Sequence, residues 1–67
     1  MDNKIMKYVP KSKAEAISKA WTDEDGMWIT LKEGWEAGRM GGGVHVIREE
    51  TIRELRHQIA GIERVEE

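Results

Sequence analysis

The sequence contains no cysteine, no phenylalanine and a single proline. Without cysteine, neither disulfide bonds nor thiolate zinc sites can stabilise the chain. A chain of 67 residues buries only about 60% of the surface that its unfolded form exposes, so the core alone leaves a small margin of stability. We therefore predict one domain over residues 1–67 that gains further buried surface by assembling as a homodimer or higher oligomer.

Long hydrophobic runs are also missing. The apolar stretches of the sequence are far shorter than the roughly 18 residues that a membrane span needs. No apolar signal-peptide segment follows Met1. We therefore expect a cytoplasmic protein with no membrane partner.

A strong excess of charge of either sign is absent, because 11 basic residues are set against 13 acidic ones. This balance favours neither strong attraction of nucleic acid nor a disordered acidic tail. The distribution is uneven, since residues 1–20 hold five lysines and two acidic residues, whereas residues 21–36 hold one lysine and five acidic residues. A folded chain can therefore still gather a basic strip.

Two strand-like runs, 20–22 and 27–31, flank the short acidic turn 23–26, which ends in Gly26. An Asp-Gly turn between such runs is typical of a β-hairpin. Alternation then gives the second strand a core face and an opposite face. The core face carries Met27, Ile29 and Leu31, and the opposite face carries Trp28, Thr30 and Lys32.

The segments before the hairpin leave alternatives open. Ala14, Ile17 and Trp21 fit a helical stripe. We favour a strand there, because a short turn needs a partner strand of comparable length. Pro10 starts or bounds this element, and residues 1–10 are expected to form a short edge strand or an ordered arm.

The second half of the chain predicts a loop, a strand and a helix. Residues 36–43 end in three glycines and are expected to form a loop, followed by a strand at 44–47. Apolar residues then recur at spacings of three and four, which predicts an amphipathic helix over 49–64. These residues are Ile52, Leu55, Ile59 and Ile62, and we expect them to form the oligomer interface. The fold class is therefore α+β, a small antiparallel sheet over residues 14–47 followed by one C-terminal helix.

No residue pattern specifies catalysis or metal binding. His45 and His57 are the only histidines, and no ligand spacing joins them. The acidic turn resembles the start of a calcium loop, but position 34 is glycine where such a loop requires glutamate. We expect no metal and no cofactor, and we favour a binding protein over an enzyme, with an active site shared across an oligomer as the alternative.

Aromatic and basic residues around the second strand indicate a nucleic-acid-binding surface. Tryptophan rings stack on bases and cationic side chains contact phosphates. The candidates are Trp28, Lys32, Trp35, Arg39 and Arg48. The alternative is that the tryptophans fill a dimer interface.

The region 27–62 also has a recognisable pattern. It holds a strand with Ile29, then Trp35, the glycine-rich connection 39–43, a strand to Ile47, and the sequence Glu-Glu-Thr-Ile-Arg-Glu-Leu at 49–55. This pattern resembles the transcriptional-coactivator, or positive cofactor four, superfamily of single-stranded-DNA-binding proteins, which includes small bacterial and phage members. The resemblance implies a curved antiparallel sheet followed by one helix, pairing of two chains, and binding of single-stranded DNA by basic and aromatic groups of the sheet.

The segments 25–32 and 45–51 look similar to small proteins of phages and prophages of Gram-positive bacteria. This resemblance implies a mobile-element origin and action in the host cytoplasm. It also implies contact with DNA or a DNA-bound host complex, including inhibition of a host defence nuclease in the manner of an anti-CRISPR protein. Two other functions stay open, namely a protein-binding inhibitor that uses the acidic turn 23–25 and a nucleotide-sequestering sponge with a pocket near residues 41–43.

Overall fold

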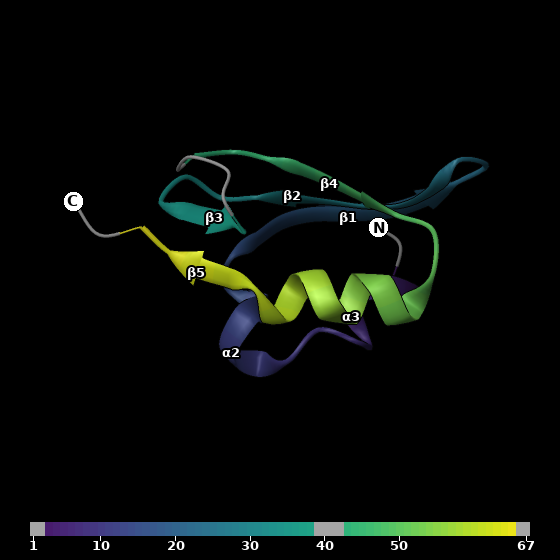
Figure 1. Cartoon of the computed structure of the whole chain (residues 1–67), viewed down its shortest axis with the longest axis horizontal. Helices are drawn as coiled ribbons and strands as arrows, with labels where there is room; N and C mark the ends of the chain where they lie inside the picture. Colours follow the sequence, from purple (N-terminus) through teal and green to yellow (C-terminus); the bar gives the residue numbers. More distant parts are fainter. Residues whose placement is uncertain (1–2, 39–42, 66–67) are drawn as a thin grey trace.

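The computed structural model describes residues 3–38 and 43–65 (Figure 1). In chain order the elements are α1 (Asn3–Met6), α2 (Lys11–Ala14), β1 (Ile17–Asp23), β2 (Gly26–Leu31), β3 (Trp35–Ala37), β4 (Val46–Glu49), α3 (Ile52–Ala60) and β5 (Ile62–Arg64). The chain therefore has an α+β fold with antiparallel sheets, as predicted. Over the described residues, no helix has the length and apolar character that a membrane crossing requires.

The main sheet has three antiparallel strands in the order β1, β2, β4. The β1–β2 hairpin closes between Asp23 and Gly26, which confirms the predicted hairpin. Gly26 has a φ of 148°, a conformation that residues with a Cβ rarely adopt. Because β2 lies in the middle, β1 and β4 are both edge strands.

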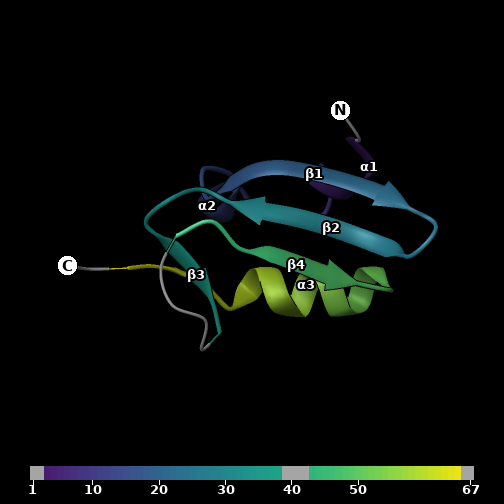
Figure 2. The same ribbon diagram turned by 90° about the horizontal axis from the view of Figure 1, so that it is seen from above.

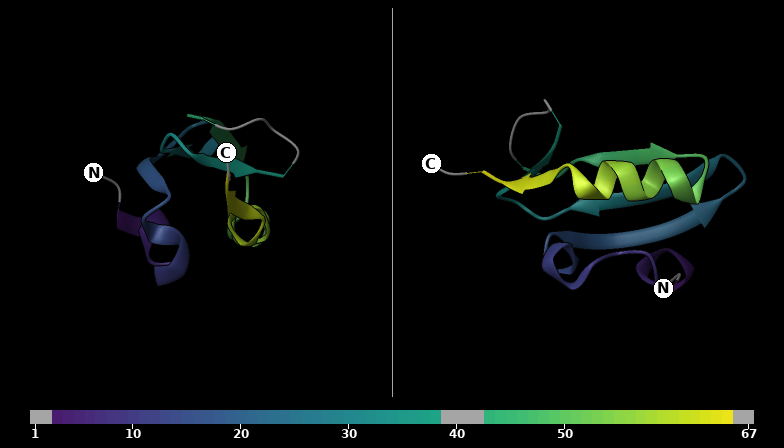
Figure 3. Two further views of the ribbon diagram at one scale, coloured as in Figure 1. Left: turned by 90° about the vertical axis from the view of Figure 1, so that its left-hand side faces the viewer. Right: turned by 60° about the horizontal axis from the view of Figure 1, so that its bottom comes forward.

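The helices lie on one face of this sheet (Figures 1 and 3). Viewed from above, α3 runs beneath β4, whereas α1 and α2 lie along β1 (Figure 2). The strand register aligns Ala20 with Ile29 and Ile29 with Ile47, and all three side chains are buried beneath the sheet. No described helix or strand covers the opposite face.

The core joins residues from both halves of the chain. A second, two-stranded sheet of β3 and β5 closes one end of it, with Ala37 opposite Ile62. The largest fully buried side chains are Ile5, Ile29, Leu31, Leu55, Ile59 and Ile62. A single chain thus supplies a core from the sheet, α1, α3 and β5.

The N-terminal segment differs from the prediction of an edge strand or arm. Residues 3–6 form the helical turn α1, because Ile5 packs into the core with no exposed surface. Pro10 precedes α2, and its carbonyl oxygen accepts hydrogen bonds from the amides of Lys13 and Ala14. The segment for which both strand and helix were considered contains both, because helix α2 ends at Ala14 and strand β1 begins at Ile17.

The predicted helix over 49–64 is too long at both ends. Thr51 caps α3 through a capping box with Glu54, so Glu49 remains in β4. Gly61 ends the helix, and Ile62 then pairs in β5 with β3. Residues 35–37 are correspondingly a strand, although 36–43 had the pattern of a loop.

The residues predicted for the oligomer interface lie in the core of a single chain or pack against it. Leu55, Ile59 and Ile62 have no exposed surface in a single chain, and Ile52 is half-buried. The apolar side of α3 fills the space beneath the sheet, so it is already used within the chain. This corrects the interface assigned to these residues.

The close approach of the hairpin turn to β4 predicts a large effect of Gly26→Ala. A Cβ at this position would lie 2.7 Å from the Glu49 carbonyl oxygen, in addition to the positive φ. We expect the free energy of unfolding to fall by about 3 kcal/mol, measured by urea denaturation. Gly38→Ala is the matched control, since its φ is 65° but a Cβ there meets nothing within 4 Å, and it should cost only about 1 kcal/mol. Equal losses in the two variants would contradict this packing.

Candidate functional site

The uncovered face of the three-stranded sheet carries a row of aromatic and cationic side chains. Strand pairing places Trp21 opposite Trp28, and Trp28 opposite Arg48. Because side chains alternate along a strand, Lys19 shares this face on β1 and Thr30 shares it on β2. We call these five residues the outer face.

The two tryptophan rings of the outer face are parallel. Their centroids lie 6.1 Å apart and their planes differ by 4°. Cross-strand neighbours on one face of an antiparallel sheet are close enough for such aromatic contacts. Both indoles are half-buried, although they point away from the core. Each ring therefore covers part of the other.

The orientation of Trp28 is set by the hairpin turn. Its Nε1–H donates a 2.9 Å hydrogen bond to Asp23 Oδ1. The same carboxylate oxygen accepts from the backbone amides of Asp25 at 2.8 Å and Gly26 at 3.1 Å. The hydrogen bond from Trp28 is the main cause that lowers the pKa of Asp23 below its ordinary value of 3.8, followed by the two amides and the charge of Arg48. The turn thus uses the Asp23 carboxylate to hold the indole.

Arg48 covers the other side of Trp28. Its Cζ lies 5.7 Å from the indole centroid, within the range of a cation–π contact. Its Nε and Nη2 donate to the Asp25 carbonyl oxygen at 3.0 and 2.6 Å. Nη2 also lies 3.6 Å from Glu50 Oε1. The guanidinium is therefore held by the turn and by Glu50.

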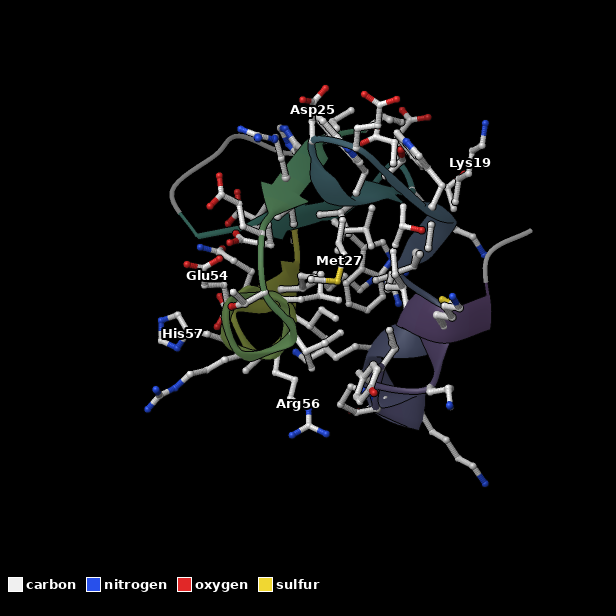
Figure 4. The ribbon with its side chains drawn as sticks, turned by 90° about the vertical axis from the view of Figure 1, so that its right-hand side faces the viewer. Lys19, Asp25, Met27, Glu54, Arg56 and His57 are labelled. Atoms are coloured by element: carbon white, nitrogen blue, oxygen red, sulfur yellow. The ribbon has the colours of Figure 1, made fainter. Side chains whose placement is uncertain are left out.

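Trp21 has a different environment, because β1 is an edge strand and no strand lies beyond it. Trp28 stacks on one side of its ring. Lys19 Nζ lies 5.3 Å from the ring centroid. The Lys19 side chain is exposed and extends away from the sheet (Figure 4). A long, exposed lysine is the kind of neighbour that can move aside for a ligand.

The structure brings only some of the predicted site residues together. Trp28 and Arg48 are neighbours on the outer face. Lys32 follows β2 and is exposed. Trp35 lies on β3 in the second sheet and packs against the core, so the prediction that it shares a surface with Trp28 is wrong. Arg39 lies outside the described residues.

Lys19 and Trp21 were not among the predicted site residues. The signal was present in the predicted hairpin, since pairing 20–22 with 27–31 around the turn places Trp21 opposite Trp28. Two-residue alternation then places Lys19 on the same face. Because this segment fitted both a helix and a strand, neither residue was assigned to the face that carries Trp28.

The structure gives less support to the acidic turn and to the nucleotide pocket as binding sites. In the acidic turn, Glu24 and Asp25 are exposed, but the Asp23 carboxylate is used to hold Trp28. Residues 41 and 42 of the predicted nucleotide pocket lie outside the described residues. Within the described ranges, no three histidine, cysteine or acidic side chains come together as metal ligands.

The lowered pKa of Asp23 predicts a pH-dependent stability difference between the wild type and Asp23→Asn. A carboxylate whose pKa is lower in the folded chain stabilises it above the unfolded value, and this contribution is lost as the pH falls through the folded value. The wild type should therefore be the more stable at pH 7, and the difference should shrink below about pH 4. Urea denaturation between pH 3 and 7 measures it.

Glu24→Gln removes a carboxylate from the same turn without removing the hydrogen bond to Trp28, and it serves as the control. It should leave the pH dependence close to that of the wild type. An Asp23→Asn variant that loses no stability relative to the wild type at pH 7 would show that the turn does not depend on the carboxylate.

Known proteins give no further guide to this site. Comparisons of the chain with models of protein families, with curated proteins and with solved structures found no match. The resemblance to the positive cofactor four superfamily stays a prediction from its motifs, and the outer face is interpreted from its own geometry.

Proposed function

We propose that the chain binds single-stranded nucleic acid on its outer face, with Trp21 as the stacking platform. The observation that carries this proposal is an uncovered sheet face whose edge tryptophan is backed by a second, parallel indole and accompanied by a lysine. Base rings stack on aromatic side chains with little dependence on sequence, and neighbouring cations contact the phosphates. Both kinds of group are present within one small area of the sheet.

The two tryptophans have separate roles in this proposal. Trp28 lies between Trp21 and Arg48, and its Nε1–H is bound to Asp23, so it supports the platform. A base stacks on the side of Trp21 away from Trp28. The Lys19 ammonium then leaves the ring and contacts a phosphate, which its flexible stem permits.

Charge orients the nucleic acid along the face. The acidic turn lies at one end of the hairpin, and Lys19 lies opposite Thr30 toward the other end, where Lys32 follows β2. The phosphates therefore lie toward Lys19 and Lys32, away from the turn. Neutralising two phosphates gives a shallow salt dependence, with a slope of roughly −1.4 in log affinity against log salt for a single strand.

The wider biological role follows from the resemblance. Host complexes that open DNA expose single strands, and a phage-derived protein that binds them can interfere with a defence nuclease. Inhibition of such a nuclease, a phage origin and action in the host cytoplasm stay predictions. Inhibition of a nuclease requires the nucleic-acid binding proposed here only if the chain contacts the DNA rather than the nuclease.

Self-association also stays a prediction. Because α3 uses its apolar side within the chain, a second copy would need another surface. In the described part of the chain, the large apolar side chains left exposed are Val44 and Val46, at 63% and 50%. Val46 pairs with Thr30 and alternates with the buried Ile47, so it lies on the same face as Thr30 and Arg48, at the sheet edge away from Trp21. A second copy that covers Val46 would therefore lie on the face that carries the proposed platform.

The proposal predicts a large loss of binding for Trp21→Leu. Removing the stacking ring should weaken binding of a labelled oligothymidylate by about tenfold or more, because stacking contributes about 1–3 kcal/mol per base. Fluorescence anisotropy at several salt concentrations measures the affinity, and circular dichroism checks the fold. Binding as tight as that of the wild type would contradict the role of Trp21.

Lys19→Gln tests the phosphate contact separately. The variant should bind more weakly, and its salt slope should be shallower than that of the wild type by about 0.7. Lys11→Gln is the matched control, because Lys11 is an exposed lysine on α2, beneath the sheet. An equal effect of the two substitutions would indicate attraction by overall charge rather than by the outer face.

A further inference from the structure

Strand β4 presents part of its backbone at an edge of the main sheet. The amide of Leu31 donates a 3.0 Å hydrogen bond to the carbonyl oxygen of His45. Because hydrogen-bonded residues alternate along an antiparallel pair, Ile47 also bonds to β2. The N–H and C=O groups of Val46 and Arg48 therefore point away from β2, on a side where no described strand pairs with β4. We call these backbone groups of Val46 and Arg48 the β4 edge.

The β4 edge is accessible, unlike the opposite edge of the sheet. Val46 is 50% exposed, and Val44, two residues before it, is 63% exposed. On β1, Trp21 bonds to Trp28, so the backbone of Ala20 points outward. Ala20 is only 4% exposed, and α1 lies along this strand (Figure 2). A further strand can therefore pair with the sheet beside β4 rather than at Ala20.

A hollow lies beneath the β4 edge, between β4 and α3. Its volume is about 330 Å³, and it is lined by Glu49, Arg53, Glu54, His57 and Gln58. Glu49 pairs with Met27 and shares the lower face of the sheet with it. Glu54 and His57 lie on the flank of α3 that is turned away from α1 (Figure 4). A strand added beside β4 would therefore direct every second side chain toward this hollow.

The hollow favours a cation beside Glu49. Burial, and next the neighbouring Glu54 carboxylate, raise the pKa of Glu49 above its ordinary value of 4.5, whereas His57 lowers it. Arg53 also lines the hollow, but it is exposed and is not among the charges that shift this pKa. Two backbone amides at the start of α3 donate to Glu54. A positive side chain beside Glu49 would offset the repulsion between the two carboxylates.

A second copy of this chain does not fit the β4 edge. Antiparallel pairing of two β4 strands would place them about 4.8 Å apart, with both copies of α3 beneath the same face. Because α3 lies beneath β4 (Figures 1 and 2), the two helices would approach to a similar spacing. Packed helices need about 8–10 Å between their axes. The β4 edge therefore suits a strand that has no helix beneath it.

We propose that the β4 edge binds an extended peptide segment of a partner protein as an additional antiparallel strand. The peptide backbone forms hydrogen bonds with Val46 and Arg48. Directly opposite side chains share a face of the sheet, so alternate apolar residues of the peptide pack against Val46. The residues between them point toward the hollow, where a lysine or arginine lies beside Glu49. This binding uses the backbone of Arg48, and it is independent of the nucleic-acid binding proposed for the outer face.

A hexapeptide of alternating valine and lysine, blocked at both ends, tests the pairing. In two-dimensional NMR of the full chain, its binding should shift the amide signals of Val46 and Arg48 and protect these amides from hydrogen exchange. A valine–glutamate hexapeptide should bind about tenfold more weakly or less, because it places carboxylates beside Glu49.

N-methylated peptides test the backbone hydrogen bonds on the unaltered chain. The valine amides of the peptide face β4 in this register, so N-methylation of the valines should weaken binding by about tenfold or more. N-methylation of the lysines, whose amides face solvent, should leave binding nearly unchanged. Equal effects of the two modifications would overturn the proposed pairing.

Variants of the chain test the charge and the edge separately. Glu49→Gln should weaken binding of the valine–lysine peptide by about two- to fivefold, whereas Glu15→Gln, at an exposed carboxylate at the end of α2, should leave it unchanged. Val46→Pro removes an amide that β2 does not use, so it should abolish binding while circular dichroism shows a folded chain. The Trp21→Leu variant should bind the peptide as the wild type does.

Three results would overturn the proposal besides equal effects of N-methylation. The first is an equal effect of the two glutamate substitutions. The second is peptide binding that leaves the amide signals of Val46 and Arg48 in place. The third is a shift of these signals with protein concentration alone, which would show that two copies of the chain pair at the β4 edge.

Discussion

The antiparallel register of β1, β2 and β4 determines which side chains meet the helices and which meet solvent. One row across the three strands, Ala20–Ile29–Ile47, is buried beneath the sheet. The adjacent row, Trp21–Trp28–Arg48, lies on the outer face. Because side chains alternate, a slip of one residue would exchange the two rows. The turn that fixes this register therefore fixes both the core and the candidate site.

The hairpin turn connects these two roles physically. Asp23 accepts the backbone amides that shape the turn and also holds the Trp28 indole. The carbonyl oxygen of Asp25 holds the Arg48 guanidinium from the neighbouring strand. Acidic residues beside the face proposed to bind nucleic acid repel phosphate. Here Asp23 acts as an internal hydrogen-bond acceptor at one end of the face, and the cations of Lys19 and Lys32 lie toward the other end.

Local pattern predicted much of this fold. Alternation and the Asp-Gly turn predicted the hairpin, and the spacing of Ile52, Leu55 and Ile59 predicted the helix. The α1 turn and the β3–β5 pair were missed, because they depend on burial of Ile5 and Ile62 by distant parts of the chain. The site residues were likewise predicted where the local pattern was clear and missed where their position depends on distant parts of the chain. Trp28 was predicted within a clear strand and Arg48 directly after the strand 44–47. Trp21 was missed in an ambiguous segment, and Trp35 was misplaced because its strand pairs with β5.

The most direct measurement is a proton–nitrogen NMR titration of the indole N–H groups with a short oligothymidylate. The three tryptophans give three separate indole signals. The account predicts that the Trp21 signal shifts most, that Trp28 shifts less because Asp23 holds its Nε1–H, and that Trp35 stays unchanged in the second sheet. A titration in which Trp35 shifts most, or in which no indole signal moves while the oligonucleotide binds, would contradict the assignment of the outer face.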